Sequence, residues 1–507
     1  MTKHYYITTP IYYVNDKPHI GHAYTTLAAD VLARFMRLDG YQVKFLTGTD
    51  EHGQKVEKAA FDAGQDPKDF VDKVSMNFRT LFEKMNFSND DFIRTTEERH
   101  KKSAIALWER LVEKDAIYLG SYTGWYAIRD EAFYTESELV NGKAPTGADV
   151  EWVEEPSYFF RLSQFQEKLL DFYDKYPHCI APAAKRNEVI SFVKSGLRDL
   201  SVSRTSFKWG IPVPKDPAHI MYVWIEALSN YITAVGFPDL EAKDFKNFWP
   251  ADVHMVGKDI LRFHAVYWPA FLMAADITPP KRVFAHGWWT NEGEKISKSL
   301  GNVIDPLDLV AQYGLDQTRY FLMREVPFGG DGDFSRSAMV QRINSNLAND
   351  LGNLVQRTAS MVYKNCDGKI PSPGTLHKED LNLIHSAENL LPLLRDLMKE
   401  QALHKALDII WQVISNANRY VDNEAPWALK KTDVARMETV LYTLMEVIRH
   451  LGLYLQPFMP GSAVKILDLL SVDPGERTFS HIGKQYRLRG KTSILEPTPI
   501  FPRYVEG

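Results

Sequence analysis

The chain has 507 residues, 45% hydrophobic and 25% charged, which is the ordinary composition of a globular protein with about three or four domains. Two cysteines are too few for a disulfide framework, and a net charge of −5 disfavours indiscriminate binding to nucleic acid. The start "MTKHYYITTP" lacks a signal-peptide pattern, and no apolar run reaches the roughly 18 residues of a membrane-spanning helix. We therefore expect a cytoplasmic protein with no membrane partner.

The first fifty residues predict a strand, a helix and a second strand. β-Branched and aromatic residues over 4–9 are typical of a strand, and the prolines of "PIYYVNDKP" indicate that a loop follows. From Gly21 to Gly40, apolar residues recur at helical spacing, and residues 41–50 again favour a strand. This β-α-β unit is typical of a doubly wound, nucleotide-binding parallel sheet, whose ligands bind at the carboxyl ends of strands and at helix amino termini.

The motif "HIGH", residues 19–22, stands where that helix begins. Two histidines at this spacing are, taken alone, more often helix-start residues than catalysts. A helix amino terminus favours phosphate through its free amide groups and its dipole, and Gly21 allows a base or ribose to approach closely. No G-x-G-x-x-G motif is present, so phosphates would have to be held by other groups. Both interpretations of His19 and His22 remain open on these residues alone.

A second motif, "KISKS" at residues 295–299, follows a strand pattern that breaks at Asn291 and Gly293. An isolated loop of this kind is ordinarily a solvated turn. Together with HIGH, the motif instead favours two mobile positive charges, Lys295 and Lys298. A loop could bring these charges to a polyphosphate as its charge redistributes during bond breaking.

HIGH and KISKS in this order resemble the signature motifs of class I aminoacyl-tRNA synthetases. Longer stretches are similar to the methionyl-tRNA synthetase family, in family order from Thr8 to Trp427, so the resemblance covers most of the chain. These stretches are "TTPIYYVNDKPHIGHAYTTLAADVLARF", "TGTDEHGQKV", "SGLRDLSVSR", "YVWIEALSNY", "GKDILRFHAVYWPAFL", "HGWWTNEGEKISKSLGN" and "NRYVDNEAPW".

The resemblance implies a Rossmann-like doubly wound α/β catalytic domain with a connective insertion, followed by an all-α helix-bundle anticodon-binding domain. It implies that L-methionine reacts with ATP, which carries Mg²⁺, to give methionyl-adenylate and pyrophosphate. The methionyl group then passes to the terminal ribose of tRNA(Met). Because no dimerisation domain is appended, we expect a monomer.

The expected domains follow from the same resemblance and from composition. The Rossmann domain spans 1–115 and 223–335, the latter including the KISKS loop, and the insertion spans 116–222. Long amphipathic helical patterns over 336–470 predict the bundle, and 471–507 form a Pro-rich C-terminal segment.

The resemblance also assigns site residues. The expected catalytic groups are His19, His22, Lys295 and Lys298. The ATP-binding residues are His19, Gly21, His22, His286, Lys295, Ser297, Lys298 and Ser299. The methionine-binding residues are Ile11, Tyr13, Asp50, Arg204, Trp224, Ala227, Leu228, Tyr231, Ile260 and His264.

Three of these assignments have competing interpretations. Asp50, which would receive the ammonium group of methionine, could instead cap a helix that begins near His52. Arg204, on the carboxylate side of the same site, could form a surface ion pair. Trp224, Leu228 and Tyr231 have helical spacing and could simply be core residues. Some relatives have proline in place of Leu228, which bears on the backbone course of the pocket.

The insertion departs from the zinc-binding pattern of many relatives. Ala127 and Asp130 occupy positions where paired cysteines would stand, and Cys179 is the single cysteine of the insertion. We therefore expect no zinc. Tyr126, Phe133 and Tyr134 are expected to fill the place of a zinc knuckle by apolar packing.

By resemblance, Asn353, Arg357 and Trp427 bind the anticodon. Asn353 and Arg357 share one helix face, and Pro426 should end a helix beside Trp427 and leave its indole near the surface. The competing interpretation makes Trp427 a buried contact between bundle helices.

Two other functions compete with this interpretation. A small-molecule nucleotidyltransferase also activates ATP at a histidine-rich helix start, but usually lacks a separate helical domain. A synthetase-derived RNA-binding protein without catalysis is disfavoured by the intact His19, His22, Asp50, Lys295 and Lys298.

Overall fold

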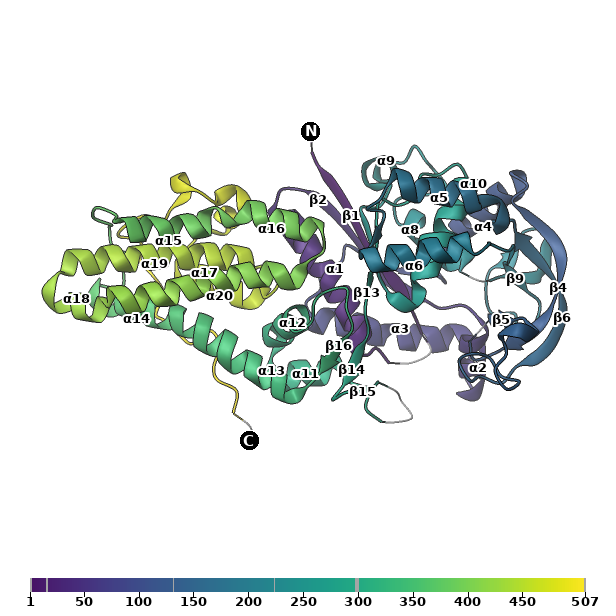
Figure 1. Cartoon of the computed structure of the whole chain (residues 1–507), viewed down its shortest axis with the longest axis horizontal. Helices are drawn as coiled ribbons and strands as arrows, with labels where there is room; N and C mark the ends of the chain where they lie inside the picture. Colours follow the sequence, from purple (N-terminus) through teal and green to yellow (C-terminus); the bar gives the residue numbers. More distant parts are fainter. Residues whose placement is uncertain (1, 15–16, 131, 223, 297–300, 506–507) are drawn as a thin grey trace.

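The computed structural model describes residues 2–14, 17–130, 132–222, 224–296 and 301–505. The molecule is elongated, with a sheet-containing catalytic half at one end and a helix bundle at the other (Figure 1). An antiparallel hairpin lies at the far end of the catalytic half. Among the described helices, none is both long enough and apolar enough to cross a membrane.

In the part of the chain that the structure describes, six parallel strands form the central sheet in the order β3-β2-β1-β12-β13-β7. Their bounds are β1 His4–Tyr13, β2 Gln42–Asp50, β3 Asp91–Arg94, β7 Ile180–Ala181, β12 Val253–Gly257 and β13 Val283–His286. The crossover helix α1, Ile20–Leu38, joins β1 to its parallel neighbour β2. The predicted β-α-β unit is therefore present. Strand β7, from within the range 116–222, joins the edge of this sheet.

Strand β1 is longer than the sequence pattern predicts. A loop was expected from Pro10 onward, but the strand continues to Tyr13, so that boundary is wrong. The register between β1 and β2 shifts between Thr8 and Ile11. This irregularity accommodates Pro10, which has no N–H to donate to the ladder, and pairing then resumes as far as Tyr13 and Asp50.

Helices surround the central sheet and connect its strands. The larger ones in the first half are α2 Gln54–Asp62, α3 Pro67–Lys84, α4 Glu98–Glu113, α5 Gln166–Lys175 and α6 Ala183–Lys194. The helices of the second half are α7 Ile225–Leu228, α8 Asn230–Thr233, α9 Lys243–Phe248, α10 Trp268–Ala274, α11 Pro306–Tyr313 and α12 Leu315–Arg324.

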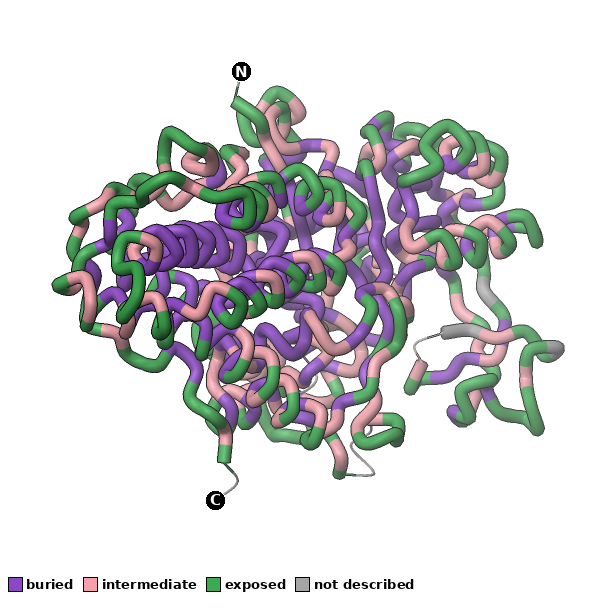
Figure 2. The backbone as a smooth tube through the Cα atoms, turned by 60° about the vertical axis from the view of Figure 1, so that its left-hand side comes forward, coloured by how far each residue is buried: buried purple, intermediate pink, exposed green. Residues whose placement is uncertain are grey.

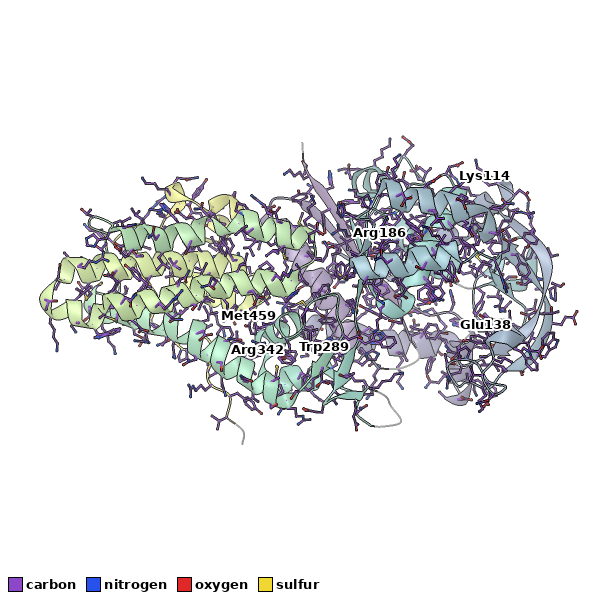
Figure 3. The ribbon with its side chains drawn as sticks, viewed as in Figure 1. Lys114, Glu138, Arg186, Trp289, Arg342 and Met459 are labelled. Carbon is purple, nitrogen blue, oxygen red and sulfur yellow. The ribbon has the colours of Figure 1, made fainter. Side chains whose placement is uncertain are left out.

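The insertion carries two small antiparallel sheets. One contains β4 Ile117–Ala127, β5 Ala132–Tyr134, β6 Glu151–Phe160 and β8 Leu200–Ser201. The other contains β9 Ser203–Arg204, β10 Pro212–Val213 and β11 Asp216–Met221. The β4–β6 hairpin forms the outermost part of the catalytic half, where Figure 3 labels Glu138 beside it.

The place of a zinc knuckle is filled partly as expected. Ala127 packs with Ala144 and Ala148, and Tyr134 lies against this cluster. The Tyr134 hydroxyl and the Thr146 hydroxyl both donate to Asp130. Tyr126 does not fill this place, because its hydroxyl lies within 3.4 Å of Gln54 and 3.3 Å of Tyr222, on the catalytic side of the insertion. The side chain of Phe133 lies outside the described residues.

A fourth sheet leads from the sheet-containing half toward the bundle. Its strands are β14 Trp289–Asn291, β15 Glu294–Lys295 and β16 Gly332–Phe334. Trp289, labelled in Figure 3 at this junction, contacts the rings of Tyr24 on α1 and Phe321 on α12. The hydrophobic core consequently runs without interruption from the central sheet into the bundle.

The bundle is built from long amphipathic helices, as the sequence predicts. Its bounds are α13 Arg336–Arg342, a π-helical turn at Ile343–Gly352, α14 Asn353–Asn365, α15 Lys378–Glu388, α16 Leu390–Lys399, α17 Leu403–Glu424, α18 Pro426–Thr432, α19 Val434–Leu455 and α20 Pro460–Leu469. Helix α19 is buried almost without interruption from Met437 onward, inside a shell of half-exposed helices (Figure 2). The C-terminal segment folds back along the bundle.

Candidate active site

The start of helix α1 holds its two histidines in a fixed arrangement. His19 is the N-cap residue, and its Nδ1 accepts from the backbone N–H of Gly21 at 3.1 Å. His22 Nδ1 accepts from the backbone N–H of His19 at 3.0 Å, and the two rings lie 3.9 Å apart. A Cβ at Gly21 would stand 2.9 Å from His19 Cε1, so a larger residue there would displace the His19 ring. The ring positions therefore follow from local backbone geometry.

Both rings are held in the neutral form. Burial lowers the pKa of His19 below its ordinary value. Burial against Tyr12 and Phe78, with the neighbouring His19 as a second cause, lowers the pKa of His22 further. Because each Nδ1 accepts a backbone N–H, the proton of each neutral ring sits on Nε2. The helix start thus presents two Nε2–H donors. The expected free amide groups are not present, because the backbone N–H groups of Ile20 and Gly21 already donate to the Ile304 carbonyl and to His19.

His286, at the carboxyl end of β13, fastens this helix start to the sheet. Its ring lies 2.7 Å from the Thr25 hydroxyl through Nε2 and 2.8 Å from the Gly287 carbonyl through Nδ1. Burial lowers the pKa of His286, so the neutral ring donates from Nδ1 and accepts from Thr25. Both ring nitrogens are engaged by protein groups, which gives His286 a positioning role in this structure.

The lysine loop approaches the same place. Lys295 ends β15, and its carbonyl accepts from the Asn302 side chain at 3.1 Å. Beyond the loop, the Ile304 carbonyl accepts from the backbone N–H of Ile20 at 3.1 Å. The segment that follows the second motif therefore lies beside the start of α1, which carries the first motif. Ser297, Lys298 and Ser299 lie outside the described residues.

The ends of β1 and β2 place three predicted residues side by side. Tyr13 pairs with Asp50 and Ile11 with Gly48 across the parallel ladder. Helix α2 has Gly53 as its N-cap and no side-chain cap, so the interpretation of Asp50 as a helix cap is wrong. Burial raises the pKa of Tyr231 on α8, and the charge of Asp50 adds to this rise.

Opposite these strand ends lies a group of aromatic rings, called the Trp224 wall below, which consists of Trp224, Phe263, His264 and Tyr231. Trp224 stacks on Phe263 at 4.5 Å and meets the edge of His264 at 5.9 Å. The Tyr231 hydroxyl lies 2.7 Å from His264 Nε2, while His264 Nδ1 lies 2.9 Å from the Ile260 carbonyl. Burial lowers the pKa of His264 to about 4, so its neutral ring donates from Nδ1 and accepts from Tyr231.

The backbone of this wall is unusual at Trp224, which begins α7 with φ 65° and ψ −6°. A bulky residue in this left-handed region is strained and persists only when its surroundings fix it. Ala227 and Leu228 follow on α7 and are buried. Two short helices, α7 and α8, take the place of the expected single helical stripe, and Ser229 between them keeps helical backbone angles.

Arg204 is placed differently from the other predicted residues. Its Nη1 donates to the Ser201 hydroxyl and the Ser203 carbonyl at 2.6 and 2.7 Å, and its guanidinium lies 4.3 Å from the Tyr222 ring. Glu155 lies 3.8 Å away. These contacts belong to the inner end of the insertion. The side chain is buried, so the interpretation of Arg204 as a surface ion pair is wrong.

At the bundle tip, Arg357 and Trp427 lie together. Helix α17 ends at Glu424 before Pro426, as predicted, and the Arg357 guanidinium lies 5.6 Å from the Trp427 ring. Trp427 is 46% exposed, so the interpretation as a buried contact is wrong. Asn353 is exposed one helical turn before Arg357 and bonds to Asn349.

Sequence reasoning missed a buried polar cluster next to this site. Glu226 Oε1 lies 2.7 Å from His52 Nδ1 and 3.4 Å from His100 Nε2. The one sequence pattern that could have indicated this cluster is "DEHG", which places His52 two residues after Asp50. In the described ranges, we find no group of three or more histidine, cysteine, aspartate or glutamate residues that could hold a metal ion.

Together, the sheet and the paired motifs define a class I aminoacyl-tRNA synthetase. Family models agree with this class. The model described as tRNA synthetases class I (M) matches residues 5–151 and 137–359, and the model described as the anticodon binding domain of methionyl tRNA ligase matches residues 370–485.

Relatives that match this chain over its full length identify the family within this class. The methionine–tRNA ligase of Rickettsia bellii (strain RML369-C) is 58% identical, with 100% of each chain covered. That of Brucella suis biovar 1 (strain 1330) is 56% identical, covering 99% of this chain and 98% of the relative. The solved structure of Mycobacterium tuberculosis methionyl-tRNA synthetase in complex with methionyl-adenylate is 52% identical, with a TM-score of 0.96 over 99% of this chain and 100% of that one. This chain belongs to the methionine–tRNA ligase family.

Proposed function

We propose that this protein attaches L-methionine to tRNA(Met) in two steps. The methionine carboxylate attacks the α-phosphorus of ATP, the bond to the bridging oxygen breaks, and pyrophosphate leaves. A hydroxyl of the terminal tRNA ribose then attacks the carbonyl of methionyl-adenylate, loses its proton, and AMP leaves with the anhydride oxygen. The observation that carries this proposal is that the start of α1, the ends of β1 and β2 and the segment that follows Trp224 are in contact. Tyr12 packs on His22, Tyr13 pairs with Asp50, and His52 bonds to Glu226.

The histidine pair supplies neutral donors for phosphate. The Nε2–H groups of His19 and His22 donate to phosphate oxygens without the desolvation cost of a buried cation. Lys295 and Lys298 add positive charge where pyrophosphate accumulates negative charge, and Ser297 and Ser299 add hydroxyl donors. Gly21 leaves space for the nucleotide, and His286 holds the helix start in place. Mg²⁺ enters with ATP as part of the substrate.

The opposite side of the site takes methionine. The Asp50 carboxylate receives the ammonium group, and Arg204 acts from the insertion on the carboxylate side. The thioether lies among Ile11, Tyr13, Trp224, Ala227, Leu228 and Ile260, because sulfur packs favourably against aromatic rings. His264 and Tyr231 already satisfy one another, so the pocket offers no unmatched charge to an uncharged side chain.

The bundle tip takes the anticodon. Trp427 offers an exposed aromatic surface on which one unpaired base can stack. Arg357 lies over the same ring, so the base would find a positive charge beside its stacking partner. Asn353 offers an amide to base edges one helical turn away. The enzyme works as a monomer in the cytoplasm.

Methionine-dependent exchange of pyrophosphate into ATP tests this function. Each of the twenty amino acids is supplied separately to the purified protein without tRNA. We expect exchange with methionine alone. No exchange with any amino acid would refute the proposed reaction, and exchange with another amino acid would refute the proposed pocket.

A further inference from the structure

Glu226 is buried between two segments that form opposite sides of the proposed methionine site. It lies on α7, two residues after Trp224, and is only 7% exposed. His52, its partner at 2.7 Å, lies in the loop after β2, two residues after Asp50. His100, on α4, lies 3.4 Å from the same carboxylate oxygen and is fully buried. One carboxylate therefore joins three elements that are distant in the chain.

The carboxylate is ionised in this environment. Burial acts to raise the pKa of Glu226, but His52 and His100 outweigh that effect and lower it to about 2. A buried carboxylate without its partners is costly, so the charge holds both imidazoles close. Replacement of the Glu226 carboxylate by a neutral amide would weaken its contacts with His52 and His100 without changing the size of the side chain.

His52 is fixed from its other side as well. The Trp209 ring meets it edge-on at 5.5 Å, and Trp209 Nε1 donates to the Glu51 carbonyl at 2.6 Å. The Gly53 backbone N–H donates to the Trp209 carbonyl. Because this loop is anchored on its outer side, its distance from α7 is set by the contact between His52 and Glu226.

The strained start of α7 requires such a contact. Trp224 has a left-handed backbone with φ 65°, which is strained for a non-glycine residue. The Ser229 backbone N–H and hydroxyl both donate to the Glu226 carbonyl and close the turn that follows. Glu226 thus joins a rigid turn on one side to the anchored loop of His52 on the other.

We propose that Glu226 is a positioning residue that sets the distance between Asp50 and the Trp224 wall, and so determines the affinity for the amino acid. This inference rests on the proposed methionine site. Glu226 touches no reacting atom in the proposed reaction and acts through His52 and Trp224. The ATP side, built on His19 and His22, shares none of these contacts among the described residues.

The test compares Glu226→Gln with wild type in methionine-dependent pyrophosphate exchange. We expect the KM for methionine to rise roughly 10-fold, within the range shown by coupled contacting groups, while the KM for ATP changes less than about twofold. His52→Asn should raise the KM for methionine in the same way. The double variant should be no worse than the more affected single variant, because either change already breaks the connection.

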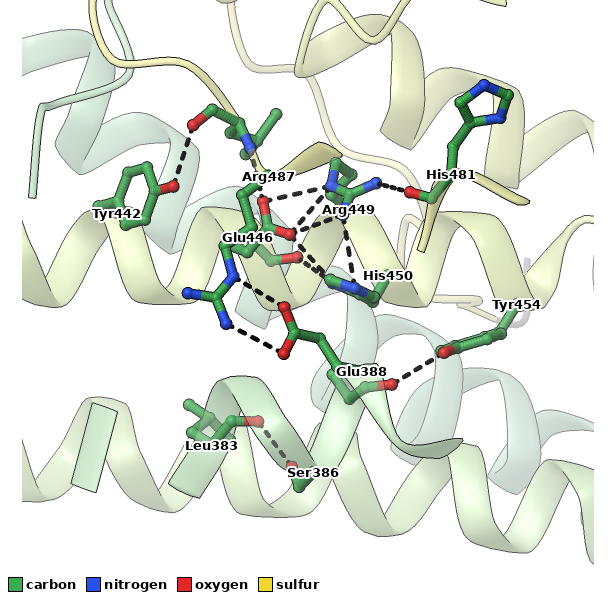
Figure 4. Close-up of polar contacts among 12 residues, drawn as sticks. Leu383, Ser386, Glu388, Tyr442, Glu446, Arg449, His450, Tyr454, His481 and Arg487 are labelled. Atoms are coloured by element: carbon green, nitrogen blue, oxygen red, sulfur yellow. Dashed lines mark hydrogen bonds and ion pairs between the residues drawn. The ribbon is translucent and has the colours of Figure 1, made fainter. Parts of the chain in front are cut away.

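A matched control separates positioning from general loss of stability. Glu446 in the bundle is also a buried carboxylate paired with an arginine and a histidine, Arg449 at 2.7 Å and His450 at 3.3 Å (Figure 4). Glu446→Gln should lower the melting temperature and leave the KM for methionine unchanged.

Each outcome decides the matter. The proposal fails if Glu226→Gln leaves the KM for methionine within twofold of wild type, raises both KM values equally, or behaves like Glu446→Gln. If Glu226→Gln does not fold, His52→Asn decides by the same criterion. Wild-type protein without methionine-dependent exchange would instead refute the proposed function, which keeps the two failures distinct.

Discussion

The two ends of the molecule use polar side chains in opposite ways. At the sheet edge, His264 is fully buried, His19 and His22 are half-buried, and burial lowers the pKa values of all three. At the bundle tip, Arg357 and Trp427 remain exposed and touch one another. Chemistry on a small anion benefits from dry, fixed donors, whereas recognition of a large unpaired loop needs an accessible surface. The two ends should therefore fail differently when they are altered.

The largest effect should come from the lysine loop. Lys298→Ala removes a charge that matters most as negative charge develops on pyrophosphate, so single-turnover adenylate formation should slow on the order of 10²-fold with methionine binding nearly intact. Lys281→Ala, at the amino-terminal edge of the sheet, removes a lysine that pairs with Asp252 and serves as the control. Equal rates in the two variants would remove Lys298 from the mechanism.

At the other end, Trp427→Ala should affect only the reaction that involves tRNA. Stacking on one base contributes about 1–3 kcal/mol, so charging of tRNA should fall roughly 5- to 150-fold. The melting temperature and methionine-dependent exchange should not change, because the indole is exposed. Tyr363→Ala alters another exposed aromatic residue on α14 and should keep full charging. Parallel loss of both activities would show that Trp427 supports the fold instead.

Lowering the pH should decrease folding stability through His450, which is buried in the bundle. Burial, together with Arg449, lowers the pKa of His450 to about 3, against about 6.5 in the unfolded chain. As the pH falls below about 6.5, the unfolded state takes up a proton that the folded state does not, so folding stability decreases. Between pH 6.5 and 5 this histidine should contribute about 2 kcal/mol of that decrease. Urea unfolding at pH 6.5 and pH 5 should show that the free energy of unfolding depends less steeply on pH in His450→Gln than in wild type. The same pH dependence in both proteins would show that His450 protonates in the folded bundle.

The smallest effect should follow metal removal. At the positions where zinc-binding cysteines would stand, Ala127 packs against Ala144 and Ala148, and Asp130 accepts hydrogen bonds from Thr146 and Tyr134. Neither side chain has a thiol with which to bind zinc. Treatment of the protein with a strong chelator should leave its melting temperature unchanged, and the exchange rate should also be unchanged once the chelator is removed and Mg²⁺ is supplied with ATP. One zinc per chain by elemental analysis would overturn our interpretation of the insertion.

Local patterns in the sequence determined much of this architecture. Helical spacing predicted α1 and the bundle, turn residues placed the ends of α1 and α17, and the two short motifs identified the nucleotide side of the site. These features depend on neighbours within a few residues, so they can be recognised before the chain is folded. The same local reasoning ended β1 too early at Pro10, because pairing with β2 overrides the break.

Tertiary structure decided what depends on distant partners. Glu226 and His52 are 174 residues apart in the chain, and no local pattern pairs them. The neutral state of His264 follows from burial, its contacts with Ile260 and Tyr231 fix which ring nitrogen carries the proton, and the exposure of Trp427 follows from the packing of the bundle tip. Burial, protonation and partner choice are set by the whole packed chain, because desolvation and hydrogen bonding depend on which surfaces meet. The sequence by itself therefore determined the family and the reaction, while the packed fold decided how each side chain is poised to take part in it.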